Sequence, residues 1–285
     1  MRISDRIRRA CFLTIALGAL AAPALAQDAD KTFRVCADPN NLPFSNQAGE
    51  GFENKLAELI AGSVGETVSY VWHAQRRGFV RETLKAKRCD VIMGMPTQLD
   101  MVETTSPYYR STYVFVSRVD RHLDIASIKD PRLRGLKIGV QIIGDDGFNT
   151  PPSHALSRQG IVNNLVGFSV FGDYTKPNPP ARIVTAVENG DVDIAAVWGP
   201  LAGYFAKHST VPLTITPITE TEDFKPLVFA YSIALGVRKH DDARKRQLDA
   251  ILKEKRHQIA ALLAEYGIPI LPLPVETGGI SAGGR

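Results

Sequence analysis

Histidines, cysteines and paired acidic residues are the side chains of this sequence that could bind a metal or carry out catalysis. The six histidines, at positions 73, 122, 154, 208, 240 and 257, form no pair with metal-ligand spacing. The turn at 144–147, Gly-Asp-Asp-Gly, lacks the pattern of a phosphate-binding loop, and its acidic pair is not followed by calcium-loop spacing. We therefore predict no catalytic residues, no metal and no cofactor.

A set of aromatic and polar side chains close to predicted strand ends indicates a binding cleft instead. Such residues suit a small organic ligand or a peptide-like segment of a partner. Phe44 fits a position in the core as well as one in the cleft. Trp198, on a strand–helix turn before Gly199, is assigned to the cleft. Arg76 and Arg77 fit a solvated helix start better than an anion-binding site. The predicted cleft residues are Asn40, Asn41, Phe44, Gln75, Arg76, Met95, Thr97, Asp145 and Trp198.

The order of the predicted elements explains why these residues should meet. A βαβαβ pattern runs from about Thr32 to Arg118, a second α/β block from about Leu136 to Ile215, and the first pattern resumes at 228–237. A chain that leaves one sheet, builds another and returns forms two lobes with two crossings and a cleft between them. Ligands of open α/β sheets bind at the carboxyl ends of the strands.

Hydrophobic patterning places the individual elements. We expect a helix from a Ser153 N-cap, and one long C-terminal helix from about Asp241 through Leu263, ended by Gly267. The crossings are expected near 119–123 and 221–226. The expected strands are 33–37, 68–72, 90–95, 112–116, 136–141, 168–171, 193–197 and 228–237.

The N-terminus is typical of an export signal. It has a basic head, an apolar stretch from Cys11 to Ala22 that is too short to span a bilayer comfortably, and a small-residue cleavage site ending at Ala26. Cleavage after Ala26 leaves 30 basic and 29 acidic side chains, a net charge of +1, which gives no indication of a nucleic-acid partner. No later stretch is apolar enough to span a membrane, so we expect a soluble, exported, periplasmic protein.

The resulting domain plan has four parts. Residues 1–26 are the signal peptide, 27–120 and 225–275 form a discontinuous lobe 1, 121–224 form lobe 2, and 276–285, rich in Gly and Ser, are a flexible tail.

Two cysteines, Cys36 and Cys89, remain after cleavage, and each lies at a predicted strand. The first and third strands of a doubly wound lobe are neighbours, and an oxidising compartment favours a disulfide over two buried thiols. Closing a loop of about 50 residues would stabilise the fold by roughly 3–4 kcal/mol. The strand register decides between the bond and two unpaired thiols.

Several motifs resemble the family-3 extracellular solute-binding proteins: FRVCADPNNLPFS at 33–45, GFE at 51–53 and SPYY at 106–109. A narrower resemblance, to the MxaJ/XoxJ group encoded with periplasmic quinoprotein methanol dehydrogenases, lies in the first of these motifs and in QRRGFVR at 75–81, RCDVIMG at 88–94 and YYRSTYVFV at 108–116. The similarity favours the XoxJ side. It implies an α/β fold of the periplasmic binding protein-like II type, with two doubly wound lobes and a two-strand hinge.

The chain departs from the amino-acid-binding branch of that family at both ends of the ligand site. That branch has a Thr-x-x-Arg motif whose arginine clamps the substrate carboxylate, whereas this sequence has Asp100 at the arginine's position. The branch also has an aspartate that holds the α-ammonium group, and Trp198 stands at that position. Free amino acids are therefore not the expected ligands.

The resemblance implies a non-catalytic accessory role in methanol oxidation. The expected partner is a quinoprotein (PQQ-dependent) methanol dehydrogenase, of the lanthanide-dependent type on the XoxJ side, with its c-type cytochrome as a second candidate, and the chain would assist its maturation or activation. One alternative is a receptor for another small solute of an ABC transporter. A remote alternative is an enzyme like cyclohexadienyl dehydratase, for which no acid partner is marked beside Arg76, Arg77 or Arg110.

Overall fold

The computed structural model describes residues 31–97, 99–144, 149–171 and 173–274. Their strands are β1 (Thr32–Ala37), β2 (Asn40–Asn41), β3 (Ser45–Asn46), β4 (Thr67–Trp72), β5 (Val91–Pro96), β6 (Glu103–Thr104), β7 (Tyr109–Arg118), β8 (Ile138–Ile142), β9 (Leu165–Ser169), β10 (Ile194–Trp198), β11 (Leu213–Pro217) and β12 (Ala230–Val237). The α-helices are α1 (Phe52–Val64), α2 (Phe79–Glu82), α3 (Pro151–Arg158), α4 (Arg182–Glu188), α5 (Gly199–His208), α6 (Asp242–Glu254) and α7 (Arg256–Glu265). Short 3₁₀ helices lie at Val119–Arg121, Pro131–Gly135, Pro179–Ala181 and Thr221–Phe224.

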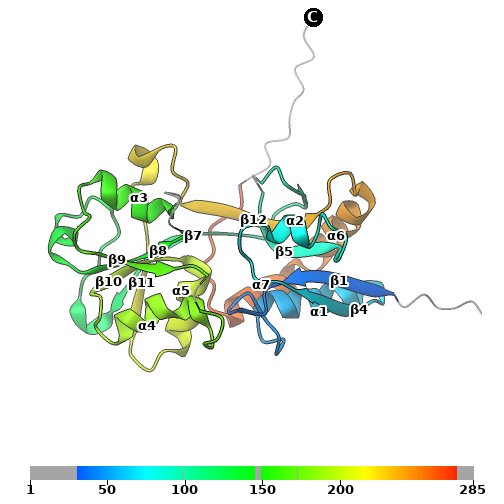
Figure 1. The fold of residues 1–285 in the computed structure, drawn as a ribbon, viewed down its shortest axis with the longest axis horizontal. Helices are drawn as coiled ribbons and strands as arrows, with labels where there is room; N and C mark the ends of the chain where they lie inside the picture. Colours follow the sequence, from blue (N-terminus) through cyan, green and yellow to red (C-terminus); the bar gives the residue numbers. More distant parts are fainter. Residues whose placement is uncertain (1–30, 98, 145–148, 172, 275–285) are drawn as a thin grey trace, which may run out of the picture. The chain divides into compact units, whose positions relative to one another are not determined.

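The central feature is a mixed sheet with the strand order β4-β1-β5-β12-β7-β10-β8-β9 (Figure 1), to which β11 and β6 also pair. Strands β4, β1 and β5 are parallel to one another, and so are β10, β8 and β9. We call the first set, with β12, the first region, and the second set, with β11, the second region. This mixed α/β arrangement agrees with the predicted fold class.

Strand β7 belongs to both regions. Its residues 109–112 pair with β12, and from Tyr113 onward it pairs with β10 and β11. The passage between the regions therefore lies within β7, earlier in the chain than the crossing expected near 119–123. The return lies where Ala230 of β12 pairs with Thr112. The residue boundaries of the two predicted lobes stay a prediction.

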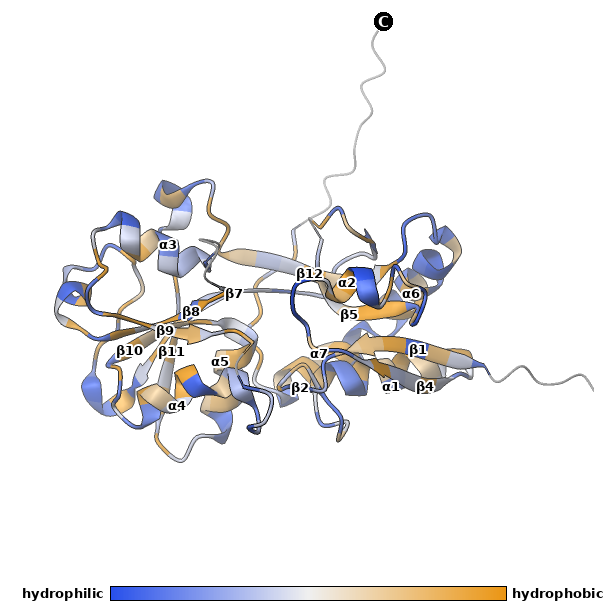
Figure 2. Ribbon diagram, viewed as in Figure 1, coloured by the Kyte–Doolittle hydropathy of each residue, from blue (hydrophilic) through white to orange (hydrophobic). Residues whose placement is uncertain are grey.

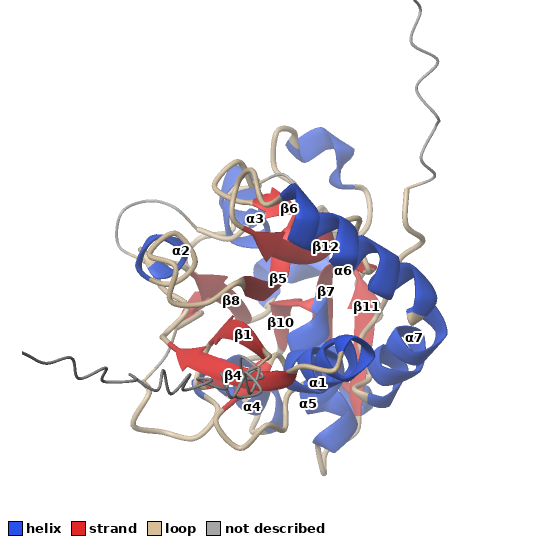
Figure 3. Cartoon of the chain, turned by 90° about the vertical axis from the view of Figure 1, so that its right-hand side faces the viewer, coloured by secondary structure: helices blue, strands red, loops and turns tan. Residues whose placement is uncertain are grey.

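The inner parallel strands β1, β5, β8 and β10 are mostly apolar and buried, whereas the outer strands β4 and β9 are half-buried or exposed (Figure 2). In the first region one face packs against α1, α6 and α7, which lie together in Figure 3. The opposite face packs against α2 and includes Cys36 and Cys89. These two cysteines form the predicted disulfide, with Cα atoms 5.5 Å apart, because β1 and β5 are paired neighbours.

Three sequence expectations about helices and strands are wrong in detail. The C-terminal helix is two helices, α6 and α7, with a break at Lys255 that lets both pack against the same core. Helix α3 begins at Pro151 after Thr150, so Ser153 is inside it; prolines are well tolerated in a first helical turn, where no N–H partner is needed. The strand expected at 168–171 is β9, which begins three residues earlier, at Leu165, and pairs with β8.

The predicted signal peptide, residues 1–26, and the predicted tail, residues 276–285, lie outside the described residues. Among the helices that the structure describes, none is both long and apolar enough to cross a membrane.

Candidate functional site

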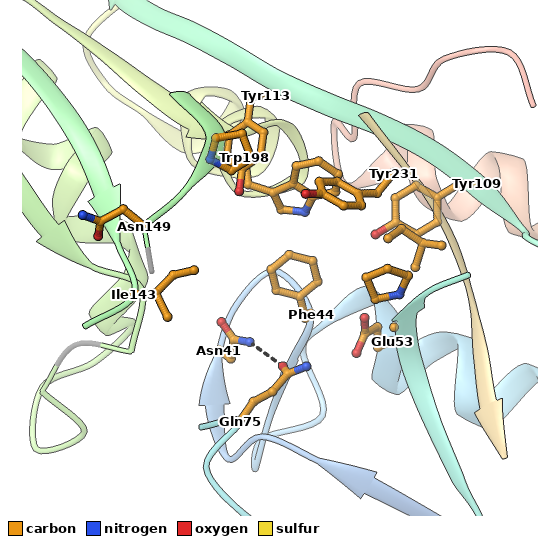
Figure 4. Close-up of a pocket in the computed structure, with 14 residues that line it drawn as sticks. Asn41, Phe44, Glu53, Gln75, Tyr109, Tyr113, Ile143, Asn149, Trp198 and Tyr231 are labelled. Atoms are coloured by element: carbon orange, nitrogen blue, oxygen red, sulfur yellow. Dashed lines mark hydrogen bonds between the residues drawn. The ribbon is translucent and has the colours of Figure 1, made fainter. Parts of the chain in front are cut away.

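A cavity of about 460 Å³ lies where the carboxyl ends of the parallel strands of both regions meet (Figure 4). The loop after β1 contributes Phe44, the loop after β4 contributes Gln75, and β10 ends at Trp198. This is the position at which open α/β sheets bind ligands. The cavity is lined by Asn41, Phe44, Glu53, Gln75, Gly94, Pro96, Tyr109, Tyr113, Ile143, Asn149, Pro151, Trp198, Tyr231 and Ile233.

Aromatic rings form one wall of the cavity. Tyr113 and Trp198 are a cross-strand pair of β7 and β10, and their ring centroids lie 5.3 Å apart with an edge-to-face tilt. Tyr231 of β12 continues the row, with its centroid 5.8 Å from that of Trp198. Phe44 lies across the cavity from this row in Figure 4. We call Tyr113, Trp198 and Tyr231 the aromatic wall.

Glu53 brings a carboxyl group into the same cavity from the first turn of α1. Its backbone N–H donates to the Phe44 carbonyl at 2.9 Å. Two glycines make this arrangement possible: a Cβ on Gly51 would overlap the Phe44 carbonyl, and a Cβ on Gly94 would overlap the Glu53 carboxylate. Burial, and to a smaller degree the charge of Asp38, raises the pKa of Glu53 to about 8.

Asp38 lines a second, adjoining cavity of about 290 Å³, which shares Phe44, Gln75 and Trp198 with the first. Its carboxylate accepts hydrogen bonds from the backbone N–H groups of Asn40 at 2.8 Å and Gln75 at 2.6 Å, and from the Tyr174 hydroxyl. Asp38 is therefore a buried anion that polar donors stabilise.

Three further contacts join the first region to the loop at 173–180. The Asn40 side chain donates to the Lys176 carbonyl at 2.8 Å and accepts from the Asn178 N–H at 3.0 Å. The Arg76 guanidinium lies 4.7 Å from the centroid of the Tyr174 ring, within the range of a cation–π contact. Tyr174, which Arg76 contacts, lines the second cavity.

The structure brings several of the predicted cleft residues together. Asn41, Phe44, Gln75 and Trp198 line the cavity, and the Asn41 amide donates to the Gln75 side-chain oxygen at 3.3 Å (Figure 4). The Trp198 N–H donates to the side chain of Gln141 at 2.9 Å, which holds this turn in place.

The remaining predicted residues lie elsewhere. Asn40 and Arg76 make the contacts to the 173–180 loop described above. Thr97 is half-buried, and its N–H donates to the Ser232 carbonyl at 3.0 Å. Met95 packs into the core beside the disulfide, because on strand β5 it points to the face opposite to Gly94 and Pro96. Its assignment to the cleft is therefore corrected. Asp145 lies outside the described residues.

Sequence reasoning missed Glu53, Tyr109, Tyr113 and Tyr231. The first two lie in the motifs GFE and SPYY, so a signal was present. Tyr113 and Tyr231 lie on β7 and β12, and only the pairing of those strands with each other and with β10 places their rings beside Trp198.

The chemistry of the cavity is that of binding. Aromatic faces, amide groups and one carboxyl group line it, and the described part of the chain contains no cluster of histidine, cysteine and acidic side chains that could hold a metal ion. Burial raises the pKa of Tyr113, and burial and the charge of Glu53 raise that of Tyr109, so both phenols stay neutral hydrogen-bonding groups.

Known proteins are similar to this chain in sequence and in fold. The chain is 34% identical over 282 residues to Protein MoxJ of Methylorubrum extorquens AM1, covering 90% of this chain and 92% of that protein. It matches the crystal structure of the periplasmic binding protein XoxJ from Methylobacterium extorquens AM1 at 34% identity and a TM-score of 0.70, covering 85% of this chain and 100% of the other. The crystal structure of MxaJ from Methlophaga aminisulfidivorans MPT matches at 27% identity and the same TM-score, over 84% of this chain and 100% of the other.

Of these similar proteins, XoxJ is a periplasmic binding protein, which agrees with the predicted non-catalytic role. The family model of the bacterial extracellular solute-binding proteins, family 3, matches residues 33–267. The chain therefore belongs to family 3 of the bacterial extracellular solute-binding proteins.

Proposed function

We propose that the chain is a periplasmic accessory protein of methanol oxidation that binds a PQQ-dependent methanol dehydrogenase, of the lanthanide-dependent type, and assists its maturation or activation. The names MoxJ, XoxJ and MxaJ of similar proteins support this, as does the resemblance of four sequence motifs to the same group. An export signal cleaved after Ala26 would deliver the chain to the compartment of that dehydrogenase.

One observation carries the proposal: the cavity is well formed and Trp198 lines it. By the resemblance described above, this residue stands where the amino-acid-binding branch has the aspartate that holds the ammonium group. Asp100, at the position of the carboxylate-binding arginine, is exposed. An amino-acid ligand would thus lack the two charged partners that the amino-acid-binding branch provides. A cavity lined by aromatic rings and side-chain amide groups suits a side chain or a segment of a partner.

Co-elution of the exported chain with purified methanol dehydrogenase tests the proposal. We expect a complex with the wild-type chain and at least a tenfold weaker one with Trp198→Ala. Val162→Ala, which trims a 57% exposed side chain outside the cavity, is the matched control and should bind like the wild type. Absence of any complex, with correctly folded wild-type protein, would overturn the proposal.

A second candidate function is a receptor that delivers a small solute other than a free amino acid to an ABC transporter. The volume of the cavity, about 460 Å³, favours it because this is the size range of small-molecule sites. Isolation of the chain from periplasm, followed by mass spectrometry, separates the two functions. A stoichiometric metabolite supports the receptor, and co-isolated dehydrogenase supports the accessory role.

A further inference from the structure

The electrostatic character of the cavity is set by one side chain. Among the described residues that line it, Glu53 is the one with a carboxyl group, and none is a lysine, arginine or histidine. Within the same part of the chain, the Glu53 carboxylate accepts no hydrogen bond and forms no ion pair. Glu53 is half-buried, and a carboxylate that has lost part of its hydration without such partners is destabilised in its ionised form.

Asp38, in the adjoining cavity, shows the usual arrangement. Its two oxygens accept three hydrogen bonds, from Asn40, Gln75 and Tyr174, so the protein itself stabilises its charge. None of the described residues donates to Glu53 in a comparable way. Its position beside Gly94 keeps the carboxyl group at the cavity surface, where a ligand can reach it.

The rings around Glu53 supply a second feature. The aromatic wall faces Phe44 across the cavity, as Figure 4 shows. The faces of aromatic rings carry partial negative charge and attract organic cations, most strongly in sites that exclude water. A carboxylate beside such rings is a combination that favours positively charged ligands and disfavours anions.

We propose that the cavity binds a compact organic cation, an ammonium or guanidinium group, with Glu53 as its counter-ion and Phe44, Trp198 and Tyr231 as its walls. The cation belongs either to a free amine or to a lysine or arginine side chain of a partner protein. The inference concerns the same cavity as the proposed function, but its test needs no dehydrogenase, so the two can fail separately.

Calorimetry with choline and its uncharged isostere 3,3-dimethylbutan-1-ol isolates the contribution of charge. We expect saturable binding of choline and at least tenfold weaker binding of the alcohol. Glu53→Gln, which keeps the shape and removes the charge, should weaken choline binding at least tenfold. Glu58→Gln, on the same helix with a 53% exposed side chain, should leave it within twofold of wild type.

A blocked Ala-Lys-Ala peptide and its Ala-Nle-Ala analogue form the second arm, because a partner's side chain would enter as part of a chain. Choline binding alone points to a free amine, and lysine-dependent peptide binding points to a protein partner. If neither cation binds better than its neutral analogue, or if Glu53→Gln binds choline like the wild type, the inference is wrong.

The pH dependence gives an independent check. The titratable groups that face Glu53 are Asp38, Tyr70, Tyr108 and Tyr109, and burial raises the pKa values of all three tyrosines. With a Glu53 pKa of about 8, its ionised fraction rises roughly 90-fold between pH 6 and pH 9. Choline affinity should therefore rise at least tenfold over this range in the wild type and stay constant in Glu53→Gln. An unchanged wild-type affinity would contradict the role of Glu53.

Discussion

Asn40 and Asn178, 138 residues apart, are joined by a hydrogen bond of 3.0 Å from the Asn178 N–H to the Asn40 side-chain oxygen. The same asparagine donates to the Lys176 carbonyl, so one side chain ties the first region to the 173–180 loop. Asn41, the next residue, lines both cavities, and Tyr174 of the 173–180 loop lines the second. We infer that Asn40 helps to keep the cavities closed.

Asn40→Ala should make the cavity more accessible without unfolding the protein, because it removes one exposed and one partly buried hydrogen bond, worth about 1 kcal/mol each. The measurement is acrylamide quenching of Trp198 in a Trp72→Phe background, since the chain has two tryptophans. Asn46→Ala is the control, because its side chain bonds within its own loop, to Glu50. Equal quenching in both variants would show that Asn40 does not hold the cavity closed.

Replacement of Cys36 and Cys89 by serine should lower the free energy of unfolding by about 4 kcal/mol. The disulfide spans 53 residues, and this closed loop restricts the unfolded chain. Urea denaturation of the variant and of the wild type, each with and without reductant, checks this. Reductant should destabilise the wild type and leave the double variant unchanged; a similar response of both proteins would count against the disulfide.

Glu53→Gln should change how stability depends on pH. The folded-state pKa of about 8 exceeds the ordinary value of 4.5, so the folded state retains a proton that the unfolded state loses. Stability of the wild type therefore falls as pH rises between about 4.5 and 8, by at most about 1.4 kcal/mol per pH unit from this group. Glu53→Gln lacks this titrating group. Its free energy of unfolding, relative to that of the wild type, should therefore increase from pH 5 to pH 8.

Urea midpoints at pH 5, 6, 7 and 8 measure that difference. Glu58→Gln again serves as the control and should follow the wild type. A constant difference between Glu53→Gln and the wild type would mean that Glu53 titrates normally.

Asp90→Asn should destabilise the protein by about 2 kcal/mol at pH 7, because charge-assisted hydrogen bonds to a mostly buried carboxylate are lost. Asp90 accepts from Arg34 through both of its oxygens at 2.8 Å and from Arg238 at 2.9 Å. Burial acts to raise the pKa of Asp90, but hydrogen bonds from the two arginines outweigh it and lower the pKa.

A lowered pKa means that this contribution is present above the unfolded value of 3.8 and is lost as pH falls through the folded value. The difference in free energy of unfolding between wild type and Asp90→Asn, measured by urea denaturation, should thus be largest at pH 7 and become smaller below pH 4. Asp120→Asn is the control, since Asp120 pairs with Arg118 at an exposed site and should have little effect. A gap that persists unchanged at low pH would exclude the ionised Asp90 as its cause.

Local patterning determined the elements of this protein. Hydrophobic patterning predicted strands at the positions of β1, β5 and β10, and the strand order β4-β1-β5 follows from the βαβαβ rhythm. From the neighbouring positions of β1 and β5, the sequence also predicted the disulfide. Phe44 and Gln75, in the loops after β1 and β4, and Trp198, at the end of β10, were predicted at the site because the carboxyl ends of parallel strands share one edge.

Only the tertiary structure decided which side chains face the cavity. Side chains alternate between the faces of a strand, so a shift of one residue separates Met95 in the core from Gly94 and Pro96 at the cavity. The aromatic wall depends on pairing between β7, β10 and β12, which are distant in sequence, and no local pattern encodes that register. The raised pKa of Glu53 likewise arises from its burial among groups that long-range packing brings together.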